Sequence, residues 1–302
     1  MLRAAIDLGT NSCLLTIAEI QSSTVVTVVE DIMRIVRLGQ DIDRTGQLHP
    51  DARARTLQAL QEYKTICEGH GIASHDVFVA ATSAMRDASN REEFIDEVKQ
   101  ATGLRIQVIS GEEEARITWN GALTQLSLSN DASPCILDIG GGSTELVWNN
   151  GLERWSMQMG SVRASERYVH DDPPPASALQ EIRDALTTQL ETLPAIPKPS
   201  PLIAVAGTAT TLLAVVHQVE PYDSSKIHGK VLKRSELQHL VELFCSMTSD
   251  HRKNLPGLHP KRADVITAGA QILLTVYEFL GLDEVVISDR GLRYGLLLEQ
   301  GG

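Results

Sequence analysis

Two short segments of this chain repeat one another, and the repeat constrains the fold more than any other feature. Residues 4–16 read AAIDLGTNSCLLT and residues 135–147 read CILDIGGGSTELV. In each, an apolar stretch ends in an aspartate, followed by an apolar residue, a glycine, three small residues and a second apolar stretch. This pattern predicts a strand, a tight turn and a second strand. The two copies are 131 residues apart, a little under half the length of the chain, and this spacing predicts that one fold occurs twice.

Strand-like and helix-like stretches alternate after each copy of the repeat, which is typical of an α/β fold. We expect further strands at residues 24–30, 76–82, 104–109, 144–148, 153–159, 202–207 and 284–288. We expect helices at residues 51–68, 91–101, 111–125, 177–193 and 261–280. The polar stretch Leu126–Ser133 is the expected boundary, so the predicted domains are residues 1–126 and 127–302.

Composition excludes several classes of protein. The chain has 302 residues, of which 42% are hydrophobic, enough for two domains with their own cores. The net charge of -12 argues against binding to duplex nucleic acid. No apolar run approaches the roughly 18 residues that cross a bilayer, and Asp7 comes too early for a signal peptide. Four cysteines without a CxxC pair predict thiols rather than a zinc site. We therefore expect a cytoplasmic protein without membrane contact.

The charge is unevenly distributed. Between Lys226 and Arg262 there are eight Lys or Arg, three acids and four His. This stretch is either a local basic surface for a small or linear polyanion, or a solvated helical face. Charge alone does not separate the two interpretations.

The two repeated turns are candidate phosphate cradles. Glycine-rich turns expose backbone N–H groups, and such groups bind anions. The candidate phosphate-binding residues are Gly9, Thr10, Asn11 and Ser12 in the first turn, and Gly140, Gly141, Gly142 and Ser143 in the second. The alternative is a pair of tight hairpins whose acids cap local backbone. The occurrence of both copies together favours the phosphate interpretation.

Several acids are placed to hold a metal or activate water. Asp7 and Asp138 end their strands beside the turns, and Mg²⁺ prefers carboxylate oxygens. Glu145 lies on the next strand and is either a further ligand or a solvent-facing residue. The run Glu112–Glu114 stands at an expected helix N-terminus, where capping explains one or two acids. The remaining carboxylate is a candidate for accepting a proton from water.

Two further segments carry anion-binding potential. Ser83 and Arg86 follow a buried-type strand and can extend the phosphate cradle, although a helix cap with a surface arginine explains them equally well. Gly207 and Thr208 form a third strand-turn-helix junction, which alone is a weak signal.

Taken together, these motifs resemble the exopolyphosphatase/guanosine pentaphosphate phosphohydrolase family of the actin–sugar kinase–Hsp70 superfamily. The resemblance runs in family order over nearly the whole chain. It is carried by IDLGTNS (6–12), ATSAMRDASN (81–90), ISGEEEAR (109–116), LDIGGGSTEL (137–146), MGSVR (159–163), AGTATT (206–211), LPGLHPKRADVITAGAQIL (255–273) and SDRGLRYGLL (288–297).

The resemblance implies an α/β protein with two actin-like (ribonuclease H-like) domains beside an active-site cleft. It implies hydrolysis of phosphoric anhydrides, releasing terminal orthophosphate from inorganic polyphosphate or from guanosine pentaphosphate (pppGpp), with guanosine tetraphosphate as a related ligand. In this comparison Glu114 matches the catalytic base, and Asp7, Asp138 and Glu145 match the acids associated with Mg²⁺. Members of the family are often dimers, so a homodimer is expected.

The chain departs from the family pattern at two points. Longer members carry a helical C-terminal extension that holds long polyphosphate, and this sequence stops at Gly302, so a preference for very long chains is not implied. Arg290 stands where the family more often has a small residue. Two rival functions stay open: a phosphotransferase, which needs an adenosine pocket and an acceptor site, and a non-catalytic nucleotide-binding scaffold, which has no need of Glu114.

Overall fold

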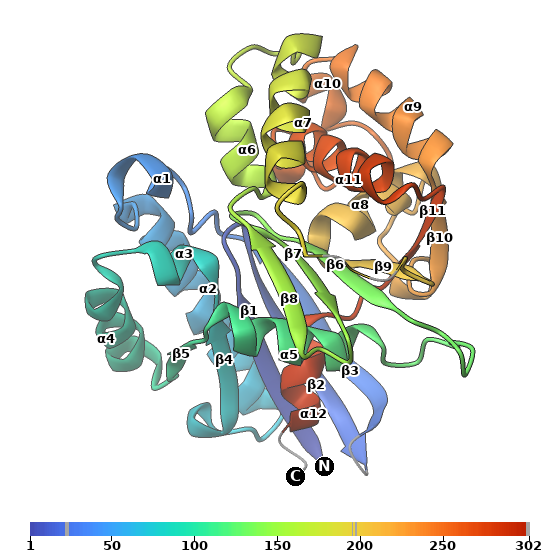
Figure 1. Ribbon diagram of the computed structural model, residues 1–302. Coiled ribbons are helices and arrows are strands. Elements are labelled where there is room, and N and C mark those ends of the chain that lie inside the picture. Colours follow the sequence, from blue (N-terminus) through green and yellow to red (C-terminus); the bar gives the residue numbers. More distant parts are fainter. Residues whose placement is uncertain (22–23, 195, 197, 300–302) are drawn as a thin grey trace. The chain divides into compact units, whose positions relative to one another are not determined.

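A computed structural model describes residues 1–21, 24–194, 196 and 198–299, and the chain divides into two compact units (Figure 1). The first unit contains residues 1–124 and the segment from Gly291 onward, and the second contains residues 125–290. The sequence placed one boundary near residue 126 and assigned everything after it to the second domain. The segment from Gly291 departs from that assignment because its helix packs on the first sheet.

The first unit is built on a mixed sheet of five strands in the order β3-β2-β1-β4-β5. Its strands are β1 (Leu2–Leu8), β2 (Ser12–Gln21), β3 (Thr24–Ile35), β4 (Val77–Ala81) and β5 (Ile106–Val108). β1, β2 and β3 pair antiparallel, while β4 runs parallel to β1 and β5 parallel to β4. Its helices are α1 (Ile42–Thr45), α2 (Pro50–Gly69), α3 (Ser83–Asp87), α4 (Arg91–Thr102), α5 (Gly111–Ala122) and α12 (Leu292–Glu299), with a 3-10 turn at Ser74–Asp76.

The second unit has a mixed sheet of six strands in the order β10-β11-β9-β6-β7-β8. Its strands are β6 (Cys135–Ile139), β7 (Thr144–Trp148), β8 (Glu153–Met157), β9 (Leu202–Val205), β10 (Lys230–Lys233) and β11 (Glu284–Ile287). Its helices are α6 (Ser161–Tyr168), α7 (Ala176–Leu190), α8 (Ala206–Val216), α9 (Arg234–Cys245), α10 (Ser249–Arg252) and α11 (Ile266–Leu280), with 3-10 turns at Ser224–Lys226 and Pro260–Arg262.

The two sheets share one plan. The order β3-β2-β1-β4-β5 of the first sheet corresponds to β8-β7-β6-β9-β11 of the second, with three antiparallel strands followed by parallel neighbours in both. The second sheet adds β10 at its edge, antiparallel to β11. The predicted α/β class is therefore confirmed, and the strand plan of the first sheet occurs again in the second.

Each unit has its own hydrophobic core, as the apolar strands require. In the first, α2 and α4 cover one face of the sheet with residues such as Leu60, Tyr63 and Phe94, which are buried. The opposite face is covered by α5 and α12. α12, red in Figure 1, lies among the blue elements of the first unit. Its contact with α5 is close, because a Cβ at Gly295 would lie 2.0 Å from the carbonyl oxygen of Ile117.

The core of the second unit surrounds α11. Most residues of this helix are buried, and it packs against α6, α7, α8 and α9. The expected helix 261–280 is interrupted before α11. Pro260 begins a separate 3-10 turn whose first N–H is capped by the His259 ring, and α11 itself starts at Ile266. The expected strand 202–207 also ends early, because α8 begins at Ala206.

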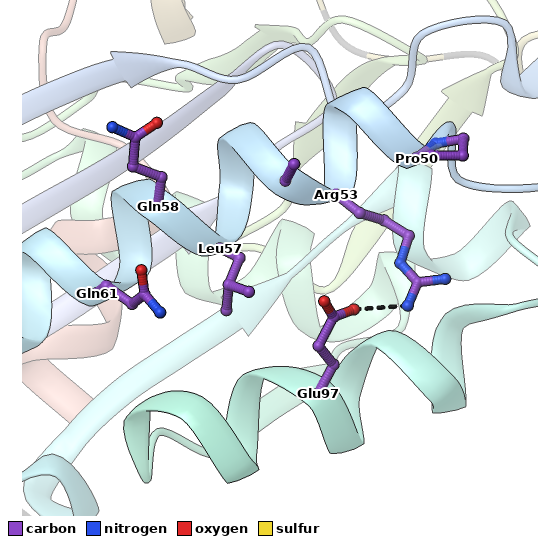
Figure 2. Close-up of a pocket in the computed structure, with 7 residues that line it drawn as sticks. Pro50, Arg53, Leu57, Gln58, Gln61 and Glu97 are labelled. Carbon is purple, nitrogen blue, oxygen red and sulfur yellow. Dashed lines mark hydrogen bonds and ion pairs between the residues drawn. The ribbon is translucent and has the colours of Figure 1, made fainter.

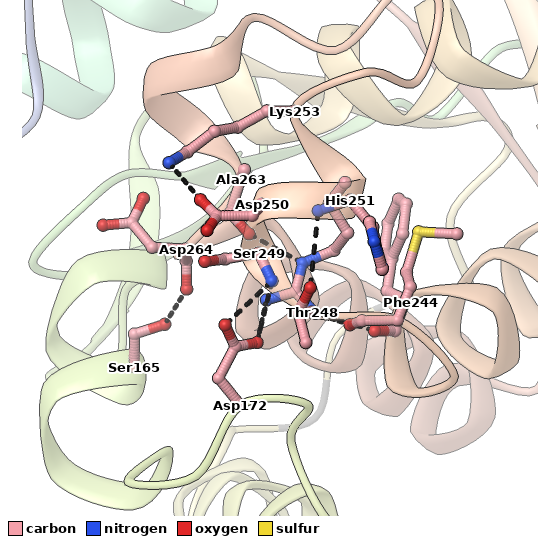
Figure 3. Close-up of polar contacts among 12 residues, drawn as sticks. Ser165, Asp172, Phe244, Thr248, Ser249, Asp250, His251, Lys253, Ala263 and Asp264 are labelled. Atoms are coloured by element: carbon pink, nitrogen blue, oxygen red, sulfur yellow. Dashed lines mark hydrogen bonds and ion pairs between the residues drawn. The ribbon is translucent and has the colours of Figure 1, made fainter.

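Arg252, the last residue of α10, is a buried arginine, and Figure 3 shows polar contacts around it, such as that between Asp172 and Ser249. Arg252 is 2% exposed and donates hydrogen bonds to the carbonyl oxygens of Ala263, Phe244 and Met247 at 2.7–2.8 Å. Its Nη2 also lies 3.3 Å from Asp172, which accepts two further bonds from the Ser249 N–H. A buried charge is tolerated only when it is paired and hydrogen-bonded, and Arg252 meets both conditions.

Candidate functional site

The two repeated turns are built alike. In the first, the N–H of Gly9 donates to the carbonyl of Ser12 at 2.9 Å. In the second, the N–H of Gly140 donates to the carbonyl of Ser143 at 3.0 Å. The repeat seen in the sequence is therefore a repeat of backbone geometry.

The carbonyl groups of the first turn are used within the first unit. The Thr10 carbonyl accepts from the N–H of Gly39 at 2.9 Å, and the Asn11 carbonyl accepts from the N–H groups of Val36 and Arg37. Both Thr10 and Asn11 are buried. The turn is therefore anchored from its carbonyl side to the segment that follows β3.

The second turn is anchored in the same way, by the start of α6. The Gly140 carbonyl accepts from the N–H of Ser161, and the Gly141 carbonyl accepts from Val162 and Arg163 at 2.9 and 3.0 Å. This approach requires a glycine before the helix, because a Cβ at Gly160 would lie 2.4 Å from the carbonyl carbon of Gly141.

The carbonyl groups of the turns have partners within the protein, whereas several of their N–H groups do not among the described residues. No hydrogen bond among the described residues uses the backbone N–H of Thr10, Asn11, Gly141 or Gly142. The buried Oδ1 of Asn11 likewise has no hydrogen-bond partner in that part of the chain. Adjacent N–H donors without protein acceptors are the arrangement that binds an anion. The structure therefore leaves both predicted phosphate turns with free donors.

Asp7 lies at the end of β1, partly buried beside the first turn. Burial, and next the charge of Glu114, raise the pKa of its carboxyl from 3.8 to about 7, and the nearby Arg293 opposes the shift. Arg293 comes from α12, where it donates to Asp31 at 2.5 Å and lies over the ring of Tyr294. Sequence reasoning did not single out Arg293. Its one signal was membership of the SDRGLRYGLL motif.

The three consecutive glutamates at the start of α5 have separate roles. Glu113 forms a capping box with Ser110: the N–H of Ser110 donates to its carboxylate at 2.9 Å, and its own N–H donates to the Ser110 hydroxyl at 3.2 Å. Glu112 is exposed. Glu114 is 14% exposed and turns to an arginine instead. Capping therefore explains one acid, as expected, and leaves Glu114 for another role.

The partner of Glu114 is Arg86. Nη1 of Arg86 donates to Oε2 of Glu114 at 2.7 Å and to the carbonyl of Ile109 at 3.1 Å. Arg86 is 25% exposed, and its ion pair with Glu114 is a contact that the alternative of a surface arginine does not require. Ser83, one turn earlier in α3, is buried. The first unit thus brings Asp7, Arg86 and Glu114 together at the carboxyl ends of β1, β4 and β5.

In the second unit, Asp138 and Glu145 are directly opposite residues of β6 and β7. Opposite residues of an antiparallel pair point to the same face of the sheet. Ser156, opposite Glu145 on β8, donates its hydroxyl to Glu145 at 2.9 Å. Glu145 is 5% exposed, which rules out the solvent-facing alternative.

The residues present fit a hard divalent cation. Paired carboxylates are oxygen ligands, and Mg²⁺ is usually held by one or two of them together with water and phosphate oxygens. Among the described residues, no group of three or more His, Cys, Asp or Glu is gathered as a metal site. The predicted ligands belong to different units, Asp7 to the first and Asp138 with Glu145 to the second.

Gly207 and Thr208 lie in the first turn of α8. β9 runs parallel to β6 with Val205 opposite Asp138, so the start of α8 follows the same sheet edge as the second turn. Arg262 packs on Gly207 so tightly that a Cβ there would be 2.0 Å from its Nη1. Burial lowers the pKa of Arg262 to about 10. In the sequence, Arg262 was part of the basic stretch and of the motif LPGLHPKRADVITAGAQIL (255–273), but it was not singled out as a site residue.

The basic stretch itself is not one continuous surface. Arg252 and Arg262 are buried, while Arg234 and Lys253 are paired with Asp283 and Asp250. Exposed Lys230 and Lys233 lie on the edge strand β10. The interpretation of the whole stretch as a polyanion surface is therefore wrong in part.

One open hollow of about 340 Å³ lies on the first unit, between α2 and α4 (Figure 2). Its arginine, Arg53, is paired with Glu93 at 3.0 Å and with Glu97 at 2.5 Å. None of the predicted site residues lines it. Because its cation is already neutralised, the hollow does not offer a phosphate site.

Duplicated sheets, each with a glycine-containing turn after an aspartate, define the α/β class of this protein. Comparison with known proteins makes this specific: the model of the Ppx/GppA phosphatase family matches residues 16–301, and the chain belongs to that family. Phosphatases of this family are generally dependent on a divalent metal. None of the helices among the described residues has the length and apolar composition to span a bilayer.

Three relatives illustrate the match. The chain is 34% identical to exopolyphosphatase 2 of Mycobacterium tuberculosis, over 99% of this chain and 98% of that protein. It is 35% identical to a bifunctional 3-dehydroquinate synthase/phosphatase of Fusobacterium nucleatum, of which it spans only 46%. The crystal structure of the Aquifex aeolicus Ppx/GppA family member is similar with a TM-score of 0.80 and 33% identity, covering 99% of this chain and 97% of that one.

Proposed function

We propose that this protein is an exopolyphosphatase-type phosphohydrolase that releases terminal orthophosphate from inorganic polyphosphate, with Mg²⁺ as its metal. The observation that carries the proposal is the duplicated turn. The N–H groups of Thr10, Asn11, Gly141 and Gly142 have no acceptor among the described residues, and an aspartate precedes each turn. The names of the relatives support polyphosphate as the substrate. pppGpp is the second substrate to test.

The residues divide the work as follows. The N–H groups of the two turns bind phosphate oxygens, with Ser83, Gly207 and Thr208 as further contacts. Asp7, Asp138 and Glu145 would hold the metal, which would supply positive charge to the phosphate oxygens. Glu114 orients a water molecule and takes its proton, so that the water attacks the terminal phosphorus in line.

The rival functions are less well supported. A phosphotransferase needs an adenosine pocket and an acceptor site in addition to the phosphate turns, and a scaffold has no use for Glu114 held by an arginine. The expected location is the cytoplasm, and the expected assembly is a homodimer, which light scattering of the purified protein measures.

The deciding experiment is a phosphate-release assay with polyphosphate, pppGpp and ATP as separate substrates, with Mg²⁺ or with EDTA, and no acceptor. We expect Mg²⁺-dependent release from polyphosphate. Transfer that requires an added acceptor establishes a kinase instead. The absence of turnover with every substrate establishes a non-catalytic protein and overturns the proposal.

A further inference from the structure

The guanidinium of Arg86 uses one nitrogen for two protein contacts. Both hydrogens of Nη1 are engaged, one by Glu114 at 2.7 Å and one by the Ile109 carbonyl at 3.1 Å. No hydrogen bond among the described residues uses its Nε or Nη2. Arginine has five N–H donors in a rigid plane, so three of them have no acceptor in the described part of the chain.

The backbone around Arg86 is fixed. Its N–H donates to the carbonyl of Thr82 at 3.0 Å, and its own carbonyl accepts from Nη1 of Arg91 at 3.0 Å. The N–H of Ile109 donates to the carbonyl of Ala81 at 3.1 Å. The guanidinium is therefore held from both sides, by α3 after β4 and by the end of β5.

We propose that Arg86 is a positioning residue that joins the catalytic base to the substrate, an inference that rests on the proposed function. One edge of its guanidinium holds the Glu114 carboxylate through Nη1. The other edge, Nε and Nη2, receives two oxygens of the terminal phosphate, a geometry that arginine forms with phosphate in bidentate fashion. A single planar group thereby sets the distance between the base and the phosphorus.

The reaction is balanced without a further reactant. The water oxygen bonds to phosphorus while one water proton passes to the Glu114 carboxylate. The bond from phosphorus to the bridging oxygen breaks, and its electron pair stays on the shortened polyphosphate. Arg86 neither gains nor loses a proton, so its contribution is geometric and electrostatic.

The substitution Arg86→Lys keeps the positive charge but removes the two-edged guanidinium. A lysine has one side-chain nitrogen, so it can hold the carboxylate or the phosphate but not both in the same geometry. We expect kcat on polyphosphate to fall about 100-fold, the scale of an error of about 1 Å in a reacting geometry. Binding of inorganic tripolyphosphate is measured by calorimetry in the Glu114→Gln background, where we expect Arg86→Lys to weaken it about 10-fold. Arg53→Lys alters another arginine–glutamate pair of the same unit and serves as the control, with kcat and binding unchanged.

The outcomes are separable. If Arg86→Lys binds tripolyphosphate more weakly but reaches the wild-type kcat at saturating substrate, Arg86 is only a phosphate contact. If its kcat falls while binding is unchanged, Arg86 only holds Glu114. Either result overturns the proposal that Arg86 joins Glu114 to the terminal phosphate. If Arg86→Lys fails to give the wild-type circular dichroism spectrum and melting curve, the same two measurements on Arg86→Gln decide. If the wild-type protein releases no phosphate, the proposed phosphohydrolase function is contradicted, and that result is distinct from the two outcomes for Arg86.

Discussion

Asp138 and Glu145 lie directly opposite one another on β6 and β7, and Ser156 on β8 donates a hydrogen bond to Glu145 at 2.9 Å. The equivalent position of the first unit differs, because Leu14 stands opposite Asp7. The repeated hairpin therefore carries two opposite carboxylates in the second unit only. That asymmetry makes the second unit the stronger candidate for holding the metal.

Glu145→Gln should weaken the affinity for Mg²⁺ without unfolding the protein. Removing one carboxylate ligand reduces the negative charge that attracts the cation, so we expect the Mg²⁺ concentration for half-maximal phosphate release to rise at least about 10-fold. Glu153→Gln, at the end of the neighbouring strand β8, is the control and should leave the Mg²⁺ titration in place. Identical Mg²⁺ titrations for Glu145→Gln and the wild type would remove Glu145 from the metal site.

Glu114→Gln should abolish turnover while substrate still binds. The amide retains the shape of the side chain but takes no proton from water, so we expect kcat to fall about 10²- to 10⁴-fold, with tripolyphosphate affinity within a few-fold of wild type. Glu113→Gln is the matched control, because Glu113 belongs to the helix cap and should cost only stability. Wild-type turnover by Glu114→Gln would be incompatible with its role as base.

Asp7 should make the metal-free protein sensitive to pH. Its pKa is raised from 3.8 to about 7 by folding, so its contribution to stability is full below pH 3.8 and is lost as the pH rises through about 7. Asp7→Asn removes this loss. In EDTA, we expect the unfolding free energy of the variant minus that of the wild type to be about 2–3 kcal/mol larger at pH 8 than at pH 5.

The control for this effect is Asp96→Asn, an exposed acid on α4 whose replacement should show no such trend. Chemical denaturation at each pH gives the free energies. Parallel pH profiles for wild type and Asp7→Asn would show that the Asp7 carboxyl titrates normally.

Gly160→Ala should displace the second predicted phosphate turn, because residue 160 packs against the carbonyl side of that turn. A Cβ at this position would lie 2.4 Å from the carbonyl carbon of Gly141, so the turn or α6 must move. We expect kcat/KM for polyphosphate to fall about 10- to 100-fold. Gly69→Ala, at the end of α2 with open space around it, is the control and should be fully active. Full activity of Gly160→Ala would show that the turn tolerates displacement.

Arg252→Met should destabilise the second unit without touching the candidate site. The change leaves three buried carbonyl groups without their donor, and we expect a loss of about 3–5 kcal/mol in the unfolding free energy measured with urea. Arg234→Met removes the partly exposed ion pair with Asp283 and should cost less than about 1 kcal/mol. Equal costs for the two variants would contradict the bonding described for Arg252.

Local patterns predicted the fold well because they depend on neighbouring residues. The repeated hairpin, with Asp7 and Asp138 at equivalent places, was visible in the sequence since strand, turn and strand are contiguous. Family membership, predicted from motifs in order along the chain, is confirmed. The roles of the individual site residues stay predictions.

Pairings between distant segments were not predictable in the same way. Arg293 reaches Asp31 across 262 positions, and nothing in the local pattern of either residue indicates the other. Arg252 carries a charge within a basic stretch, so composition placed it on the surface, whereas its bonds to backbone carbonyls bury it. Arg290, unexplained by the family pattern, donates from Nη2 to Gln125 at 2.6 Å and so joins the last residue of the second unit to its first.

The return of α12 to the first unit has a consequence for synthesis. Leu292, Leu296 and Leu297 complete the cluster over β1, yet the ribosome adds them after everything else described. The second unit, continuous from residue 125 to 290, can acquire its native contacts while the first still exposes an apolar sheet face. The half of the molecule that is translated first therefore completes its core only after α12, the last helix to be synthesised, is in place.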